Sequence, residues 1–184
     1  MQVKRVLIRR EQIAQRVEEM GRLITAELEA ESSAGNPGPV VLIPVLTGAL
    51  VVVAELMRHI PVSMSIRPVT LSSYPGRATA SQGVTVQSGI PTDLKGARVL
   101  IVDDILDSGR TLGLLRRVIQ AQQPRSLRLA VLLNKTKPEG REEDVPVEYF
   151  GFRIADEFVV GYGLDFDGLY RNLPDIVTLA DPGA

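Results

Sequence analysis

Three aspartates lie close together in the stretch from Val99 to Leu112, which reads VLIVDDILDSGRTL. Asp103, Asp104 and Asp107 supply carboxylates that can accept hydrogen bonds from hydroxyl groups and can hold or release a proton. The segment that follows, 108–111, opens an amphipathic stretch that predicts a helix. Its free main-chain N–H groups and the positive end of the helix dipole are therefore available to bind an anion. Hydroxyl-binding carboxylates beside an anion site indicate a ribose 5-phosphate.

Apolar strands must position these aspartates. The runs Arg98–Asp103 and Val40–Leu46 are continuously apolar up to their ends, which is typical of parallel strands covered on both faces. Ligands of such sheets bind at the carboxyl ends of the strands. We therefore expect three segments to meet at one rim: Leu46–Gly48, Asp103–Thr111 and the residues after Leu133.

The rest of the chain alternates strands with helices. Apolar spacing predicts helices at Glu11–Glu31, Ala49–Arg58 and Thr111–Gln122. An edge strand is expected at the N-terminus. Further strands are expected from Pro61 through Leu71 and at Leu127–Leu133, and short strands are expected after Pro146. The Gly- and Ser-rich stretch 72–88 is long for a connection and predicts a mobile active-site loop. This order predicts one α/β domain, residues 1–184, with a central parallel sheet flanked by helices.

Composition excludes several classes of site. The 184 residues carry a formal net charge of −1, contain no cysteine and include one histidine, His59. Thiol chemistry, zinc fingers and disulfides are thereby excluded, and a metal must bind oxygen ligands, which favours Mg²⁺. The near-neutral charge argues against a nucleic-acid partner.

Two further features bear on location. The apolar stretch Val40–Ala54 is too short to span a membrane, so no membrane partner is expected. The basic start MQVKRVLIRR has no apolar segment after it and does not read as a secretory signal. A cytoplasmic location is the expectation.

The stretch VLIVDDILDSGRTL closely resembles the phosphoribosyl pyrophosphate signature of the type I phosphoribosyltransferases. The order of PVLTGALVVVAEL, LSSY with its long loop, LLNKTKP and FVVGYGLDFDGLYRNLP is similar to hypoxanthine-guanine phosphoribosyltransferases nearly from end to end. The resemblance implies the type I fold with a small hood made by the N- and C-terminal segments. It also implies phosphoribosyl pyrophosphate and a 6-oxopurine as substrates, Mg²⁺ as cofactor, and a homodimer or homotetramer.

The resemblance assigns roles on the sugar-phosphate side of the site. Asp103 and Asp104 would hold the ribose hydroxyls and, with Asp165, would help to bind Mg²⁺. Pyrophosphate would bind Arg171 and the main-chain amides of Thr47 and Gly48, although the family commonly carries lysine where this chain has Thr47. The 5-phosphate would bind the segment made of Asp107, Ser108, Gly109, Arg110 and Thr111. Ser73 and Tyr74 would belong to the mobile loop that excludes water.

The remaining roles concern the purine. In the resemblance Asp107 would act on purine N7, Lys135 would face the 6-oxo group, Phe158 would stack on the base and the Val159 carbonyl would accept from its 2-position edge. Asp165 would lie beside this base site. A lysine ammonium has only donors, so Lys135 suits a carbonyl oxygen better than a 6-amino group.

Several residues of these motifs have a simpler interpretation. Asp107 or Ser108 could be a helix N-cap, and Lys135 a solvated strand end. Phe158 and Tyr162 could be core aromatics, and Arg171 a surface charge.

The function predicted from these residues is purine salvage, in which hypoxanthine or guanine and phosphoribosyl pyrophosphate give IMP or GMP and pyrophosphate. Two alternatives stay open. One is a transferase that prefers xanthine, with the same chemistry. The other is a regulator that keeps this fold but binds RNA or DNA; the near-neutral charge and the lack of an added DNA-binding domain argue against it.

Overall fold

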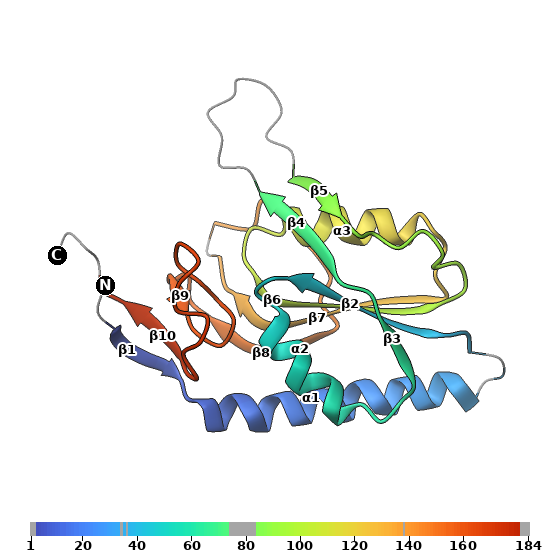
Figure 1. Ribbon diagram of the computed structural model, residues 1–184, viewed down its shortest axis with the longest axis horizontal. Coiled ribbons are helices and arrows are strands. Elements are labelled where there is room, and N and C mark those ends of the chain that lie inside the picture. Colours follow the sequence, from blue (N-terminus) through green and yellow to red (C-terminus); the bar gives the residue numbers. More distant parts are fainter. Residues whose placement is uncertain (1–2, 34, 36, 74–83, 138, 181–184) are drawn as a thin grey trace, which may run out of the picture.

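A largely parallel sheet forms the centre of the molecule (Figure 1). The computed structural model describes residues 3–33, 35, 37–73, 84–137 and 139–180, and for residues 72–73 and 84–88 it describes the backbone alone. The strands are β2 (Val40–Leu46), β3 (Met64–Ile66), β4 (Val69–Ser73), β5 (Val84–Ser88), β6 (Arg98–Leu106), β7 (Ser126–Lys135) and β8 (Tyr149–Ile154). Over the described residues they form a seven-stranded sheet in the order β5-β4-β2-β6-β7-β8, with β3 also paired to β2. Strand β5 alone among these seven pairs antiparallel, with β4.

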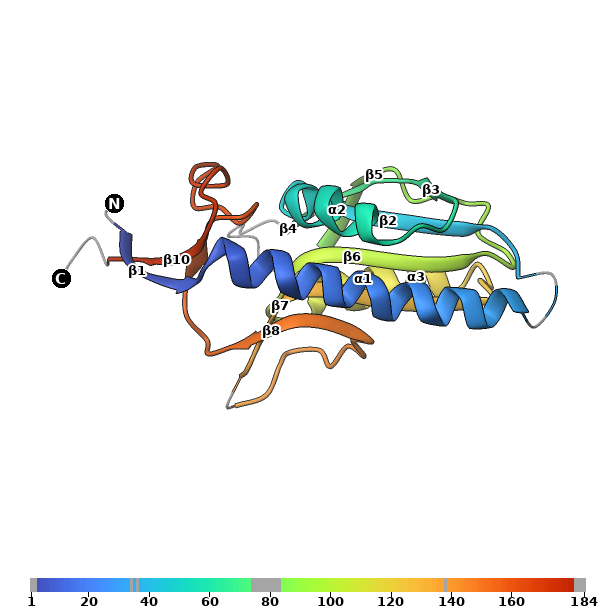
Figure 2. The same ribbon diagram turned by 90° about the horizontal axis from the view of Figure 1, so that it is seen from below.

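Helices cover both faces of this sheet. They are α1 (Arg10–Ser33), α2 (Leu50–Leu56), the short 3-10 helix η1 (Met57–His59) and α3 (Arg110–Gln120). Figure 2 shows α1 in front of the sheet and α3 behind it. Successive strand residues point to opposite faces, so Val40 and Leu42 pack with α1 and α2 while Val41 and Ile43 pack with α3. This two-sided burial explains the uninterrupted apolar runs in the sequence.

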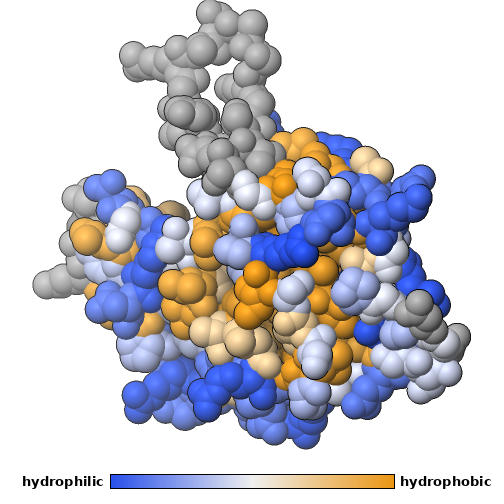
Figure 3. Space-filling view, turned by 45° about the vertical axis from the view of Figure 1, so that its right-hand side comes forward, coloured by the Kyte–Doolittle hydropathy of each residue, from blue (hydrophilic) through white to orange (hydrophobic). Residues whose placement is uncertain are grey.

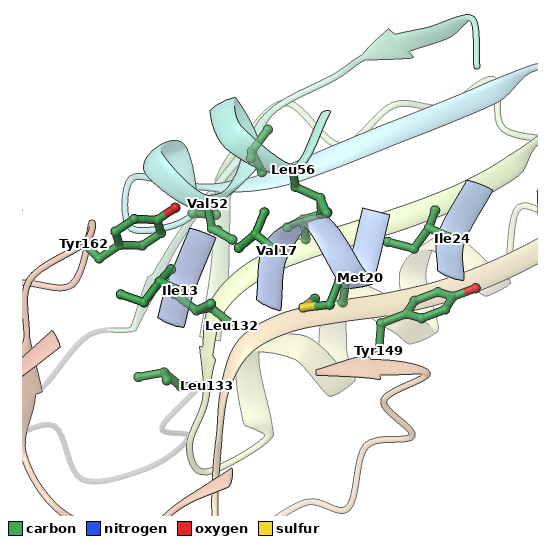
Figure 4. Packing of buried hydrophobic residues seen from close by; sticks show 14 of the residues in the cluster. Ile13, Val17, Met20, Ile24, Val52, Leu56, Leu132, Leu133, Tyr149 and Tyr162 are labelled. Atoms are coloured by element: carbon green, nitrogen blue, oxygen red, sulfur yellow. The ribbon is translucent and has the colours of Figure 1, made fainter. Parts of the chain in front are cut away.

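The core beneath α1 depends on its regular apolar spacing. Ile13, Val17, Met20 and Ile24 are each at most 1% exposed and form one stripe along the helix. Figure 4 shows these side chains packed against those of α2 and of β7. The helix thereby fixes the sheet that positions the site.

A second, smaller sheet lies beside the carboxyl ends of the parallel strands. It consists of β1 (Val3–Ile8), β10 (Ile176–Leu179) and β9 (Val159–Val160), paired antiparallel in the order β1-β10-β9. Figure 1 shows that it brings the two ends of the described chain together, next to the start of α1. This is the expected hood, and β1 is its edge strand as predicted.

Several predicted boundaries need correction. The strand expected from Pro61 through Leu71 is two strands, β3 and β4, because Pro68 has no N–H group with which to continue the ladder. The outer parts of the predicted 72–88 loop lie in β4 and β5, so the connection between these strands is shorter than expected. The short apolar piece at Val159 forms only a two-residue strand, because its neighbour Gly161 leaves the strand with φ of 97°.

Apolar residues also gather on the outer surface (Figure 3). Large apolar side chains that are exposed include Leu50 of α2, Met57 of η1 and Ile66 of β3. Among the described residues no helix has both the length and the apolar character needed to cross a membrane.

Candidate active site

The carboxyl ends of β2, β6 and β7 meet at one cavity of about 380 Å³, here called the site cavity. It is lined by Val45, Leu46, Gly48, Leu71, Asp103, Asp104, Ile105, Asp107, Lys135, Phe158, Val159, Leu164, Asp165 and Arg171. The first nine come from the central sheet and the loops that follow its strands, and the last five from the C-terminal segment. The prediction that three segments meet at one rim is confirmed.

Asp103 and Asp104 lie at the wall of this cavity within β6 and are 8% and 9% exposed. The Asp104 main-chain N–H donates to Asp103 Oδ1 over 2.9 Å. Burial and the neighbouring Asp104 carboxylate raise the pKa of Asp103 well above its usual range. Burial also raises the pKa of Asp104, against the attraction of Arg171. Two adjacent buried carboxylates of this kind favour a ligand that brings hydroxyl donors or positive charge.

The loop after β2 approaches this acidic pair closely. A Cβ atom on Gly48 would overlap the carboxylate of Asp104, so only glycine fits this position without displacement. Gly163 of the C-terminal segment lies directly on the Gly48 carbonyl, where a Cβ would overlap that oxygen. Thr47 is exposed and does not line the site cavity, and the peptide bond between Leu46 and Thr47 is cis.

The first turn of α3 follows the aspartates directly. Gly109 is its N-cap residue, with a φ of 87° and no side-chain cap. The interpretation of Asp107 or Ser108 as a helix cap is therefore wrong, and both side chains are left for other contacts. Glu143 supports this turn, since its N–H donates to the Ser108 carbonyl over 3.1 Å. Arg110 forms an ion pair with Glu142, and Thr111 is half-buried in the same turn.

Asp107 belongs to a closed set of four charged side chains, called here the charged ring. Lys135 Nζ lies 2.9 Å from Asp107 Oδ2 and 3.2 Å from Asp156 Oδ1. Lys137 Nζ lies 2.6 Å from Asp107 Oδ1 and 2.8 Å from Asp156 Oδ2. Partial burial opposes the ionisation of Asp107, but hydrogen bonds from Lys137 and Lys135 outweigh it and hold its pKa below the usual range. Lys135 is only 8% exposed, so the solvated strand end is wrong.

The segment between β9 and β10 contributes Asp165 and Arg171 to the site cavity. Arg171 Nη2 lies 2.7 Å from Asp165 Oδ1, and its Nη1 donates to the Gly163 carbonyl over 2.6 Å. Asp165 also accepts from the Gly168 N–H over 2.8 Å. Arg171 thus lines the site cavity and is no isolated surface charge.

A hard cation fits part of the predicted metal set. Asp103 and Asp104 supply adjacent oxygen ligands in the site cavity, which suits Mg²⁺. Asp165 is held by Arg171, so it would have to exchange that partner to bind a metal. Within the described part of the chain, no three acidic, histidine or cysteine side chains are grouped closely enough to hold a metal by themselves. A metal bound here would therefore need further ligands from a phosphate-bearing substrate.

The predicted base-stacking residue is exposed. Phe158 is 55% exposed at the mouth of the site cavity and meets Phe166 edge-on at 5.5 Å between ring centroids. Its core interpretation is wrong. Tyr162, in contrast, is 7% exposed and its hydroxyl bonds Glu55, which confirms the core interpretation for that residue. Val159 is buried beside Phe158 and lines the same cavity.

The predicted mobile loop is only partly described. The backbone of Ser73 ends β4, and Tyr74 lies outside the described residues. Leu71, just before them, lines the site cavity, so β4 leads from its wall.

Comparisons with known proteins agree with this geometry. A family model described as the phosphoribosyl transferase domain matches residues 11–167. Hypoxanthine phosphoribosyltransferase of Escherichia coli K12 is 40% identical over 171 residues, which cover 93% of this chain and 92% of the relative. The hypoxanthine-guanine phosphoribosyltransferase of Mycobacterium tuberculosis H37Rv is 43% identical over 181 residues, or 98% and 87% of the two chains. The chain belongs to the hypoxanthine-guanine phosphoribosyltransferase family.

Solved structures of this family share the whole fold. A hypoxanthine-guanine phosphoribosyltransferase from Bacillus anthracis, with HEPES in its active site, gives a TM-score of 0.84 at 37% identity and covers 97% of this chain and 100% of that one. A hypoxanthine phosphoribosyltransferase from Trypanosoma cruzi gives 0.85 at 34% identity, covering 97% and 92%. This chain is thus a phosphoribosyltransferase with the type I fold, while the roles of its individual residues stay predictions.

Sequence reasoning missed three members of the site. Lys137 and Asp156 complete the charged ring, and Arg141 donates to the main-chain carbonyls of Asp107 and Lys135. Lys137 and Arg141 lie close to Lys135 in the sequence. A cluster of cations after a strand is also typical of a solvent-exposed strand end, so the sequence did not identify them as part of the site. The partner Asp156 is 19 residues further along the chain than Lys137, and that contact follows only from the parallel pairing of β7 and β8.

Proposed function

We propose that this phosphoribosyltransferase joins hypoxanthine or guanine to phosphoribosyl pyrophosphate, forming IMP or GMP and releasing pyrophosphate. The observation that carries the proposal is the pairing of Asp107 with Lys135 at the wall of the cavity that also contains Asp103 and Asp104. A carboxylate and an ammonium side by side match two neighbouring purine atoms, the N7 position and the 6-oxo oxygen. The names of the relatives support the same substrates.

The sugar-phosphate would occupy the sheet side of the site cavity. Asp103 and Asp104 would accept hydrogen bonds from the ribose hydroxyls, and the first turn of α3 with the segment from Asp107 would bind the 5-phosphate through main-chain N–H groups. Gly48 and Arg171 line the site cavity, and the Gly48 amide, the amide of its neighbour Thr47 and the Arg171 guanidinium would bind pyrophosphate. Because Thr47 lacks the positive charge common in the family, Arg171 would be the main cationic contact for that group.

The purine would lie between Phe158 and the charged ring. Phe158 is exposed at the cavity mouth and available for stacking, and the Val159 carbonyl would accept from the 2-position edge. In the reaction the bond from ribose C1 to the pyrophosphate oxygen breaks and the bond from C1 to purine N9 forms. Pyrophosphate leaves with the bonding electron pair, and Asp107 would hold the purine proton at N7.

Positive charge develops on the ribose ring as this bond breaks, and negative charge gathers on the pyrophosphate. Bound Mg²⁺ would supply Lewis-acid stabilisation of that leaving group, with Asp103, Asp104 and Asp165 as its candidate protein ligands. The loop after β4, with Ser73 and Tyr74, would exclude water that otherwise hydrolyses the activated sugar.

A spectrophotometric assay tests the proposal directly. The wild-type protein is incubated with phosphoribosyl pyrophosphate, Mg²⁺ and, separately, hypoxanthine, guanine, xanthine or adenine. We expect turnover with hypoxanthine or guanine and at least 100-fold lower kcat/KM with adenine, because Lys135 has no acceptor for a 6-amino group. No turnover with any base would refute the proposal, and highest kcat/KM with xanthine would establish the xanthine-preferring alternative.

The regulator alternative has its own test. Filter binding at low salt would show micromolar nucleic-acid binding with a steep salt dependence if the chain were a regulator. We expect neither. The predicted cytoplasmic location and the homodimer or homotetramer also stay predictions.

A further inference from the structure

The two side chains that would meet the purine are bonded to each other in this structure. Asp107 Oδ2 and Lys135 Nζ lie 2.9 Å apart, so the base cannot engage both until this contact opens. Lys135 is nearly buried, and a buried ammonium left without any oppositely charged partner is strongly unfavourable. Purine binding therefore needs replacement partners for both groups.

Those partners are already in contact. Asp156 Oδ1 lies 3.2 Å from Lys135 Nζ, and Lys137 Nζ lies 2.6 Å from Asp107 Oδ1. Lys137 and Asp156 also pair with each other at 2.8 Å, with both oxygens of Asp156 within reach. If the contact between Asp107 and Lys135 opens, each of the four charges keeps an oppositely charged neighbour.

Lys137 lies outside the cavity that would hold the purine. Asp107 and Lys135 line the site cavity, and Lys137 does not. Lys137 lines a separate pocket of about 280 Å³ on the other side of Lys135, together with Asn134, Thr136, Arg141, Asp144 and Arg153. It thus reaches the Asp107 oxygen that is not bonded to Lys135, from outside the base site.

We propose that Lys137 and Asp156 are positioning residues for the purine: they hold Asp107 and Lys135 in place when the base inserts between them. The N–H at purine N7 donates a hydrogen bond to the Asp107 carboxylate, and the 6-oxo oxygen accepts one from the Lys135 ammonium. Neither positioning residue touches the substrate. This inference rests on the proposed function, in which Asp107 and Lys135 contact the base.

Charge at residue 137 is the property to vary. Lys137→Gln should raise the KM for hypoxanthine about 10-fold or more, the size expected when a charge-assisted hydrogen bond is lost, and should leave the KM for phosphoribosyl pyrophosphate within about 2-fold. Lys137→Arg keeps the cation and should restore most of the purine affinity. Asp156→Asn should resemble Lys137→Gln, and the double variant should lose much less than the product of the two single effects.

A pH profile separates positioning from a general loss of stability. The charged groups that face Asp107 are Lys135 and Lys137, with Asp156 across the ring and Arg141 at the Asp107 carbonyl. Without the Lys137 charge, the acid limb of kcat/KM for hypoxanthine should move to higher pH. Glu157→Gln is the matched control, since Glu157 follows Asp156 but pairs at the surface with Arg5 of the hood over 2.6 Å. It should leave both KM values and the pH profile unchanged.

The outcomes are distinguishable. An inactive wild-type protein refutes the proposed function itself. An active wild type with unchanged purine KM and pH profile in Lys137→Gln overturns only the positioning role, as does equal loss in Lys137→Gln and Lys137→Arg. If Lys137→Gln does not fold, Asp156→Asn and Lys137→Arg decide the question: an unchanged purine KM in Asp156→Asn overturns the role, and a raised one supports it.

Discussion

The behaviour of the three aspartates of the phosphoribosyl pyrophosphate signature depends on what surrounds each carboxylate. Asp103 and Asp104 are buried side by side, and their pKa values rise. Asp107 is only three residues further on, yet Lys137 and Lys135 hold its pKa below the usual range. At neutral pH Asp107 is therefore ionised and able to hold a substrate proton, whereas the other two favour ligands that neutralise them.

Replacing Asp107 tests its role in proton handling. Asp107→Asn keeps the size of the side chain and removes the acid-base group, so kcat with hypoxanthine should fall by roughly 10² to 10⁴. The affinity for phosphoribosyl pyrophosphate with Mg²⁺, measured by calorimetry, should change much less because main-chain groups would bind the phosphate. Full activity in this variant would show that Asp107 has no catalytic role.

The buried acidic pair predicts a pH dependence of stability. A carboxyl group whose pKa is raised by folding stabilises the folded state fully below the pKa of the unfolded chain, about 3.9 for aspartate, and that contribution is lost as pH rises through the folded value. Asp103→Asn removes the loss, so in metal-free buffer its Tm at pH 8 should exceed that of the wild type by about 3 °C or more.

The same comparison at pH 4 should show a smaller difference, since the wild-type carboxyl group is then largely protonated in the folded state. Thermal unfolding followed by circular dichroism measures both values. A Tm difference that is the same at both pH values, or that is larger at pH 4, contradicts the assignment of a raised pKa. Binding of phosphoribosyl pyrophosphate should weaken in the same variant, because Asp103 would hold ribose hydroxyls.

At the level of elements, the loop after β2 packs so closely on β6 and the C-terminal segment that no side chain fits at Gly48 or Gly163. The loop after β2 meets Asp104 of β6 through Gly48, and Gly163 of the C-terminal segment covers the Gly48 carbonyl. Three parts of the chain that are distant in sequence therefore share one close contact. A small change in the loop after β2 should be felt at the acidic pair.

Gly48→Ala tests this contact. The added methyl group would displace the Asp104 carboxylate, so the KM for phosphoribosyl pyrophosphate should rise about 10-fold or more while the KM for hypoxanthine changes little. Gly21→Ala is the matched control, because its methyl group would lie 2.5 Å from His59 Cβ, where α1 packs against η1. It should lower Tm without changing either KM, and an equal rise of KM in both variants would contradict the account.

Local patterns predicted the elements well where burial is regular. The strand Val40–Leu46 has the predicted bounds, and α1 begins and ends within two residues of the prediction, because each follows an unbroken apolar pattern. The break at Pro68 was missed although a proline is a local signal for the end of a strand, and the short strand at Val159 was missed although Gly161 follows it so closely. Within the site, the rim was predictable from strand ends, whereas the contact of Lys137 with Asp156 depends on tertiary pairing.

At the scale of the whole molecule, the central sheet provides Asp103, Asp104 and Lys135 to the site cavity, and the C-terminal segment provides Phe158 and Arg171. The site is complete only where these two parts meet. The apolar side chains exposed on α2, η1 and β3 lie outside that meeting point and are typical of a protein interface.

The predicted oligomer can be tested on this surface. Leu50, on α2, is 56% exposed, and Leu50→Glu should shift the mass measured by light scattering from a dimer or tetramer toward the 20.0 kDa monomer. Leu23→Glu alters a leucine that is 54% exposed on α1 and should leave the oligomer intact. A wild-type monomer would refute the oligomer prediction, and an unchanged mass in Leu50→Glu would exclude this surface as the interface.

The central claim is that ribose 5-phosphate is transferred from pyrophosphate to a 6-oxopurine. Phosphorus NMR of the wild-type protein with phosphoribosyl pyrophosphate and Mg²⁺, with and without hypoxanthine, measures this transfer most directly. The account predicts that pyrophosphate and IMP appear together in equal amounts and that almost no pyrophosphate forms without the base. Pyrophosphate released at the same rate without hypoxanthine, or no IMP in its presence, would contradict it.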